Sequence, residues 1–251
     1  MEAVKSGREG AVKKGGKKGA DRGEPGGVPV TRRERARRSR LRILGAAREV
    51  FAANGYHGAT MSEIAEASGL AVQTVSYFFG TKARLLSDLL GAAVMGELPD
   101  GEEGARPGDP AESDWFAAAM ADDDGPRALG TFVGGAVDVF ARAAAVAEVA
   151  RVAALTDPEV EAVYRRAEDL RVAQFRRIVR ALGEHGWLRA DLTEDLATDV
   201  LVTVLSSPTY LALRIDRGWS PAQITAWFTE ALTRLLLTDA PHRRIAARAL
   251  G

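Results

Sequence analysis

Residues 60–82 read TMSEIAEASGLAVQTVSYFFGTK, and this stretch determines the expected fold. Thr60 and Glu63 have the spacing of a capping box, in which a hydroxyl and a carboxylate cover free amides at the start of a helix. Gly69 follows about two turns later, too soon for an independent helix but suited to the turn of a helix-turn-helix. The stretch therefore predicts two short helices, beginning near residues 61 and 72 and crossing over a small core.

The second of these helices has an outer face that suits the major groove of DNA. Gln73, Thr74, Ser76 and Tyr77 share this face, and beside them Val72 can meet a thymine methyl group. Gln73 is the best candidate to read a base, because its amide can pair with adenine through two hydrogen bonds. Two alternatives stay open: Gln73 is an ordinary solvated position, and Tyr77 packs against the helix expected over about residues 33–53.

The flanking residues predict one helix on each side of this pair. Apolar residues recur at helical spacing between residues 43 and 51 and predict a helix over about residues 33–53, which Asn54-Gly55 ends. Thr81-Lys82 opens a further helix with leucines at 85, 86, 89 and 90 on one face. We therefore expect a DNA-binding domain over residues 32–92.

Charge is segregated along a chain of zero formal net charge. Residues 1–40 hold thirteen basic and five acidic side chains, whereas residues 97–124 hold ten acidic ones and a single arginine. The first segment suits a polyanion. Our hypothesis is that the arginines of residues 32–40, Arg38 and Arg40 among them, form an arm along DNA phosphates or in the minor groove. The alternative is a solubilising tail.

The rest of the chain predicts an all-α protein, with a helical bundle after the N-terminal helix-turn-helix domain. Residues 1–31 read as a disordered basic tail, 93–125 as an acidic linker rich in Pro and Gly, and 241–251 as a flexible tail. The bundle, over residues 126–240, is expected to contain helices at 127–155, 158–184, 193–216 and 221–238, since capping residues and prolines mark three of the starts.

Several classes of protein are disfavoured by what the sequence lacks. There is no cysteine, and His57, His185 and His242 have no partners at metal-ligand spacing, so we expect no metal and no cofactor. We find no phosphate-binding Gly loop and no nucleophile elbow, so we expect no enzyme. The apolar segment 127–155 carries Asp138, Arg142, Glu148 and Arg151, so we expect no membrane span.

Residues 43–90 resemble the DNA-binding domain of the tetracycline-repressor (TetR) family. The motifs in register are Ala47 with Phe51, Gly55-Tyr56, Thr60, Ile64-Ala65, Gly69-Leu70, Thr74-Val75, and Tyr77 with Phe79 and Lys82. The resemblance implies that Thr60, with the amides of Met61 and Ser62, binds a phosphate. It also implies that Thr74 and Tyr77 contact the DNA backbone and that Lys82 sits on a phosphate.

Three positions depart from the family pattern. Ala71 stands where the family usually has a serine cap, which costs about 1 kcal/mol of capping. Val72 often has a lysine counterpart, and Ser76 an aromatic one. The second helix of the motif therefore has no positive charge, and we expect the attraction to DNA to come from Lys82 and the arginine arm.

The resemblance also implies a function for the whole chain: a homodimeric repressor in the bacterial cytoplasm, bound to the nucleoid through double-stranded DNA with a pseudo-palindromic operator, and released by a small-molecule effector. Candidate dimer residues are Leu201, Leu205, Leu211, Trp227, Leu232 and Leu235. Candidate lining residues of an effector pocket are Phe132, Phe140, Tyr164, Phe175 and Trp187, for which plain core packing is the alternative. A non-specific, nucleoid-like DNA protein is the competing function, because the basic tail would suit it.

Overall fold

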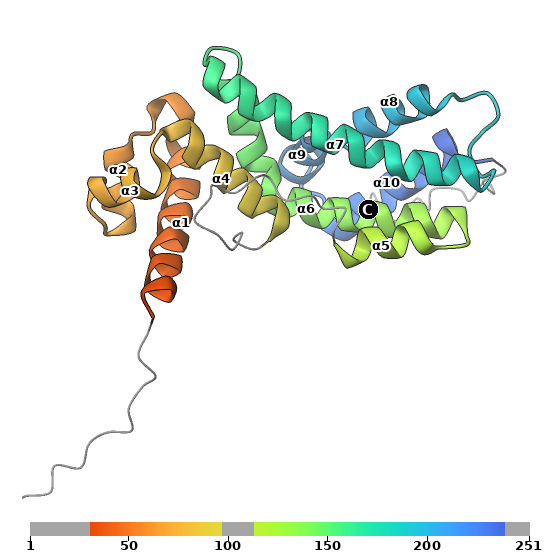
Figure 1. Cartoon of the computed structure of the whole chain (residues 1–251). Helices are drawn as coiled ribbons and strands as arrows, with labels where there is room; N and C mark the ends of the chain where they lie inside the picture. Colours follow the sequence, from red (N-terminus) through yellow and green to blue (C-terminus); the bar gives the residue numbers. More distant parts are fainter. Residues whose placement is uncertain (1–30, 97–112, 239–251) are drawn as a thin grey trace, which may run out of the picture.

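The computed structural model describes residues 31–96 and 113–238, and within these ranges the regular secondary structure is helical, which confirms the all-α prediction (Figure 1). A lone antiparallel bridge joins Leu188 and Leu237. Of the predicted tail at residues 1–31, all but Thr31 lies outside the described residues, as do residues 97–112 of the expected linker and the predicted tail at 241–251.

The first four helices lie at one end of the molecule (Figure 1). They are α1 (Arg32–Gly58), α2 (Met61–Ser68), α3 (Val72–Phe79) and α4 (Lys82–Met95). Helix α1 starts earlier than expected, because the Thr31 hydroxyl accepts from the Glu34 amide and caps it. Gly55, with a φ of 66°, breaks the helical geometry inside α1 at the predicted stop.

The remaining helices form the second part of the molecule. They are α5 (Asp114–Ala121), α6 (Gly125–Ala153), α7 (Pro158–Glu184), α8 (Glu194–Val204), α9 (Ser207–Leu211) and α10 (Pro221–Leu236). Helix α6 is the central element: its buried face contributes Phe132, Val137 and Phe140 to the core of this part.

Helix α6 also joins the two parts of the molecule. Val146, Ala150 and Ala153, near its C-terminal end, are buried in the same apolar cluster as the helix-turn-helix, together with Val160 of α7. The core of the N-terminal helices therefore extends beyond residue 92, the expected domain boundary.

Helix α5 corrects the expectation of a linker over residues 93–125. Phe116 and Ala119 are buried in the main core, and Trp115 lies against Gly135 of α6. A β-carbon at Gly135 would lie 2.1 Å from the Trp115 ring, so only glycine leaves room for the indole. The expectation was wrong here because an eight-residue helix among Pro, Gly and acidic residues has too few apolar positions to show a period.

The expected continuous helix over residues 193–216 is interrupted. Leu205 leaves helical geometry, and the extended Ser206 caps the new helix α9, in which Pro208 occupies the first turn. Residues Ala212–Asp216 continue as a π-helical segment. Proline has no N–H to donate to the preceding turn, which explains a break at this position.

Two helical stretches in the described ranges, α6 and Glu194–Asp216, are long and apolar enough to span a membrane by length and composition. The apolar window of α6 is 56% buried by the rest of the protein, as in a core helix. The absence of a membrane span therefore stays a prediction.

Candidate DNA interface and effector cavity

The turn between α2 and α3 is held from two sides. Gly69 adopts the left-handed conformation with a φ of 63°, and the amide of Leu70 donates to the Ala65 carbonyl at 3.0 Å. From α1, Arg42 Nη2 donates to the Ser68 carbonyl at 2.5 Å. Helix α3 is therefore fixed against α2 by backbone and side-chain contacts rather than by packing alone.

The outer face of α3 is open to solvent. Gln73, Ser76 and Val72 are exposed, and Tyr77 is 81% exposed, so the alternative that Tyr77 packs against α1 is wrong. Thr74 is half-buried. Ala71 provides no side-chain cap for α3, in agreement with the departure noted in the sequence.

The start of α2 has the predicted capping box. Thr60 Oγ1 accepts from the Glu63 amide at 3.1 Å, and Glu63 Oε2 accepts from the Thr60 amide at 2.8 Å. Ser62 is exposed and Met61 is half-buried. Because the Thr60 hydroxyl already serves the cap, the amides of Met61 and Ser62 are the better phosphate donors at this helix start.

Lys82 has an internal role that the sequence did not predict. Its Nζ donates to the carbonyls of Tyr56 and Ala59 at 2.7 and 2.8 Å, and lies 4.3 Å from the centre of the Tyr56 ring. Only one of its three N–H groups is left for a phosphate. Lys82 therefore ties the start of α4 to the end of α1.

Arg40 corrects a prediction. It was expected on DNA, but its side chain is only 12% exposed and pairs at 2.5 Å with Asp88 of α4, which is 3% exposed. Its guanidinium also lies 5.0 Å from the centre of the Phe79 ring. Burial raises the pKa of Asp88 above its ordinary value, and the charges of Arg40 and Arg84 oppose that shift. Arg40 thus joins α1 to α4.

The other arginines of the expected arm are exposed and helical. Arg32, Arg33, Arg35 and Arg37 lie in the first turns of α1, and Arg38 is exposed and pairs with Glu34 at 3.2 Å. In Figure 1 this end of α1 extends away from α2 and α3. The described part of the arm is therefore a helix.

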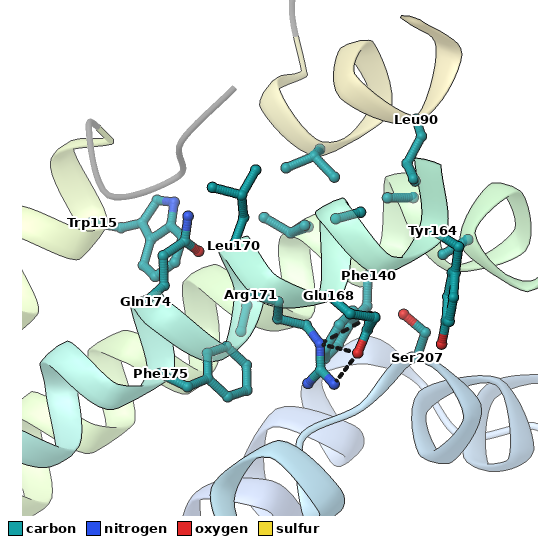
Figure 2. A pocket seen from close by; sticks show the side chains of 16 residues that line it. Leu90, Trp115, Phe140, Tyr164, Glu168, Leu170, Arg171, Gln174, Phe175 and Ser207 are labelled. Carbon is teal, nitrogen blue, oxygen red and sulfur yellow. Dashed lines mark hydrogen bonds and ion pairs between the residues drawn. The ribbon is translucent and has the colours of Figure 1, made fainter. Parts of the chain in front are cut away.

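A cavity of about 100 Å³ lies among α4, α5, α6, α7 and α9 (Figure 2). Three of the five expected residues line it: Phe140, Tyr164 and Phe175. Phe132 lies behind the wall, packed edge-on against Phe175, and Trp187 stacks on His185 away from the cavity. Both were expected as lining residues, but Phe132 is a core position and Trp187 is half-buried against the core, because a spaced aromatic in a sequence does not show whether it meets a cavity.

Other lining residues were not predicted. Leu90 and Val94 of α4, Trp115 of α5, and Glu168 and Arg171 of α7 take part. Trp115 stood out in the sequence as an isolated aromatic among acidic residues. Glu168 and Arg171, one helical turn apart, resemble any surface ion pair, so no sequence signal separated them from solvated residues.

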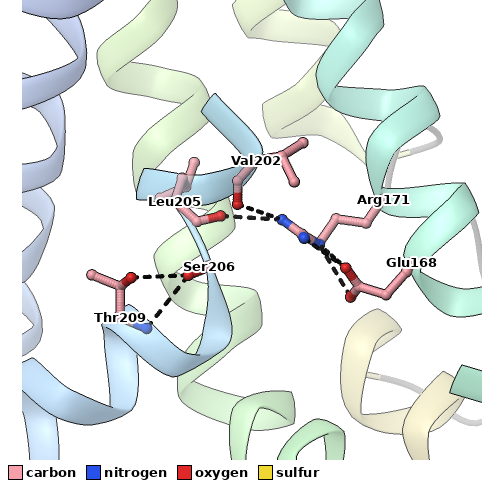
Figure 3. Close-up of polar contacts among 6 residues, drawn as sticks. All are labelled: Glu168, Arg171, Val202, Leu205, Ser206 and Thr209. Carbon is pink, nitrogen blue, oxygen red and sulfur yellow. Dashed lines mark hydrogen bonds and ion pairs between the residues drawn. The ribbon is translucent and has the colours of Figure 1, made fainter. Parts of the chain in front are cut away.

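Arg171 makes the main polar contacts of the cavity (Figure 3). Its Nη2 donates to Glu168 at 2.6 Å, and its Nη1 donates to the carbonyls of Val202 and Leu205 at 3.2 and 3.3 Å. These carbonyls lie at the end of α8, where no following helical turn supplies N–H groups to donate to them. Arg171 therefore caps the helix break described above.

Three of the expected dimer residues are core residues. Leu201, Leu205 and Leu232 have no exposed surface in the single chain, so they cannot meet a second copy. Leu211 and Trp227 are partly buried, and Leu235 is 41% exposed. The broad apolar faces of these helices turn inward in this part of the chain, and the sequence pattern alone did not separate their inner and outer sides.

The fold is that of a helix-turn-helix protein, in which the outer face of α3 is exposed and a second, helical domain contains a cavity. Residues 43–89 match the sequence model described as bacterial regulatory proteins, tetR family. The N-terminal part of the chain is thus a TetR-family DNA-binding domain, and the chain has the fold of TetR-family transcriptional regulators. It is a DNA-binding regulator of transcription.

Solved structures cover most of the chain. FadR of Bacillus subtilis, in complex with stearoyl-CoA, has a TM-score of 0.61 and 17% identity, over 77% of this chain and 97% of its own. NalD of Pseudomonas aeruginosa, the secondary repressor of the MexAB-OprM multidrug efflux pump, has a TM-score of 0.60 and 20% identity, over 82% and 100%. A Saccharomonospora viridis protein in complex with choline has a TM-score of 0.59 and 19% identity, over 80% and 98%. Comparison with curated protein sequences gives no match.

Proposed function

We propose that the chain is a homodimeric repressor that reads a pseudo-palindromic operator in double-stranded DNA and leaves it when a small molecule binds. The observation that carries the proposal is the exposed outer face of α3, held rigidly by the turn at Gly69. The cytoplasm, with the nucleoid as the bound location, is the compartment this function requires.

Base reading is assigned to α3 and phosphate contact to its surroundings. Gln73 projects from the start of α3 and can pair with an adenine, while Val72 can meet a thymine methyl group. Tyr77 and Thr74 are placed to contact the sugar-phosphate backbone. Helix α3 has no positively charged side chain. The amides at the start of α2 and the exposed arginines of α1 therefore supply the electrostatic attraction to the DNA phosphates.

Dimerisation is assigned to the outer sides of α8 and α10 and the segment between them. Leu196 of α8, Ile215 of the π-helical segment and Leu235 of α10 are exposed apolar residues in this region. A second copy related by a two-fold axis would cover them and set two recognition helices at half-sites about 34 Å apart or somewhat more.

Effector release is assigned to α4, which joins the cavity to the DNA interface. Leu90 and Val94 line the cavity, and the same helix begins at Lys82, beside the helix-turn-helix. Arg142 of α6 donates to the carbonyls of Ala93 and Val94 at 3.2 and 3.1 Å, so the end of α4 is anchored to the effector domain. A ligand that favours another position of α4 would lower operator affinity by shifting the population.

Footprinting on the DNA upstream of the protein's own gene tests the proposal. We expect protection of one palindrome, and the Gln73→Ala variant should lose about 1–3 kcal/mol of discrimination at one base pair in each half-site. Uniform weakening over all base pairs would contradict the role of Gln73.

A nucleoid-like DNA protein is the second candidate, favoured by the exposed arginines of α1. It predicts protection that spreads without a boundary and a binding constant insensitive to operator sequence. Replacing Arg37 with Gln should lower the slope of log affinity against log salt by about 1 per subunit under either function. The same change at Arg180, on the distant part of α7, is the matched control and should leave the slope unchanged.

A further inference from the structure

The cavity has a charge arrangement that limits what it can bind. Among its lining residues only Glu168 and Arg171 are charged, and the two are paired with each other at 2.6 Å. Arg171 also donates to the two carbonyls at the end of α8 and lies over the Phe175 ring, 5.2 Å from its centre. Neither charge is therefore free to balance a ligand ion.

Two hydroxyls at one end of the cavity are free. In Figure 2 Tyr164 and Ser207 lie near each other, away from Trp115. Within the ranges 31–96 and 113–238 neither hydroxyl makes a hydrogen bond. Burial is the main cause that raises the pKa of Tyr164, so its phenol stays neutral and can donate at pH 7.

The size and the apolar walls suggest the shape of the ligand. The cavity of about 100 Å³ is of the order of an engineered cavity of ~150 Å³ that holds benzene. Apolar side chains form most of its wall, among them Phe140, Phe175, Trp115 and several alanines. One ring with a short chain matches this space.

We propose that the effector is an uncharged, mainly apolar molecule whose single hydrogen-bonding end meets Tyr164 and Ser207. This assignment rests on the proposed effector role of the cavity. A carboxylate or phosphate would lose its hydration without gaining a free cation. An ammonium would meet Arg171, which already covers the Phe175 face. The class therefore differs from the acyl-CoA and the choline held by the two similar structures.

Three probes with one skeleton test the class: 3-phenylpropan-1-ol, 3-phenylpropionate and 3-phenylpropylammonium. Their binding to the full chain, without DNA, is measured by titration calorimetry at pH 7. We expect the alcohol to bind at least about tenfold more tightly than either ion, because each ion must be desolvated without a partner. Equal or tighter binding of an ion, or no binding of any probe, would overturn the proposal.

Two variants test the reasoning behind this order. Glu168→Gln keeps the shape but leaves Arg171 unbalanced, so the preference should shift toward phenylpropionate by about tenfold, whereas Glu161→Gln on the same helix should not change it. Tyr164→Phe should weaken binding of the alcohol by about tenfold and leave binding of propylbenzene unchanged. An unchanged order of the probes in Glu168→Gln, or an equal loss of alcohol and propylbenzene in Tyr164→Phe, would refute the charge or the hydroxyl argument.

Operator binding by the same preparation separates this proposal from the proposed function. If the protein binds the operator but none of the probes, the proposed ligand class is refuted and the proposed DNA-binding role is not. If the protein binds the alcohol but no DNA, the proposed ligand class is supported and the proposed role as a regulator is refuted.

Discussion

Replacing Arg40 with methionine should destabilise the protein strongly at neutral pH. The change leaves Asp88 buried without its nearest cation, and breaking one partner of a buried pair typically costs about 3–5 kcal/mol. The charge of Arg84 still acts on Asp88, so we expect the lower end of this range, about 3 kcal/mol. The free energy of unfolding, measured by urea titration with circular dichroism, checks the value.

The dependence on pH follows from the direction of the Asp88 shift. A carboxyl whose folded pKa lies above its ordinary value of 3.8 favours the folded state when protonated, and this contribution is lost as pH rises through the folded pKa. Without Arg40 the pKa rises further, because the opposing charge is gone. The destabilisation should therefore shrink as pH falls from 7 toward 4.

Two further variants decide whether the reasoning holds. Arg38→Met removes an exposed pair on the same helix and should cost less than about 1 kcal/mol. The double variant Arg40→Met with Asp88→Leu should recover most of the loss, since Arg40 Nε already lacks a hydrogen-bond partner in the described structure. A loss in Arg40→Met no larger than in Arg38→Met, or no recovery in the double variant, would refute the argument.

Three other substitutions have defined outcomes. Thr60→Ala should lower the free energy of unfolding by about 1 kcal/mol in the same urea titration, because the capping box of α2 is lost. Gly69→Ala should cost about 1–2 kcal/mol and weaken operator binding, since the turn needs a left-handed residue. Gly135→Ala should displace Trp115 and shift tryptophan emission to longer wavelength; Gly134→Ala, whose β-carbon meets nothing within 4 Å, should leave the emission unchanged.

The sequence predicted the helix-turn-helix well because its signals are local. Thr60 with Glu63, Gly69 and Thr81 each mark a helix end through contacts within a few residues, and the structure has those ends. The break at Ser206 also has a local cause in Ser-Ser-Pro, but the apolar period on both sides of it masked the signal.

What the sequence did not predict depends on distant partners. Arg40 resembled its exposed neighbours, and only the fold brings Asp88, 48 positions later, within 2.5 Å of it. The burial of Leu201 and Leu232 likewise depends on how α8 and α10 pack against α6, and the periodicity of the sequence does not show this packing. The cavity combines five helices, so its lining could not be assigned from any one of them.

Under the proposed function, α4 couples the effector cavity to the DNA interface, and this coupling is thermodynamically reciprocal. Leu90 and Val94 of α4 form part of the cavity wall. Asp88 of the same helix accepts a hydrogen bond from Arg40 of α1, the helix that carries the exposed arginines. If an effector lowers operator affinity by some factor, operator DNA must lower effector affinity by the same factor. A variant selected only for tighter binding to DNA would therefore need a higher effector concentration to leave the operator, even if no atom of its cavity had changed.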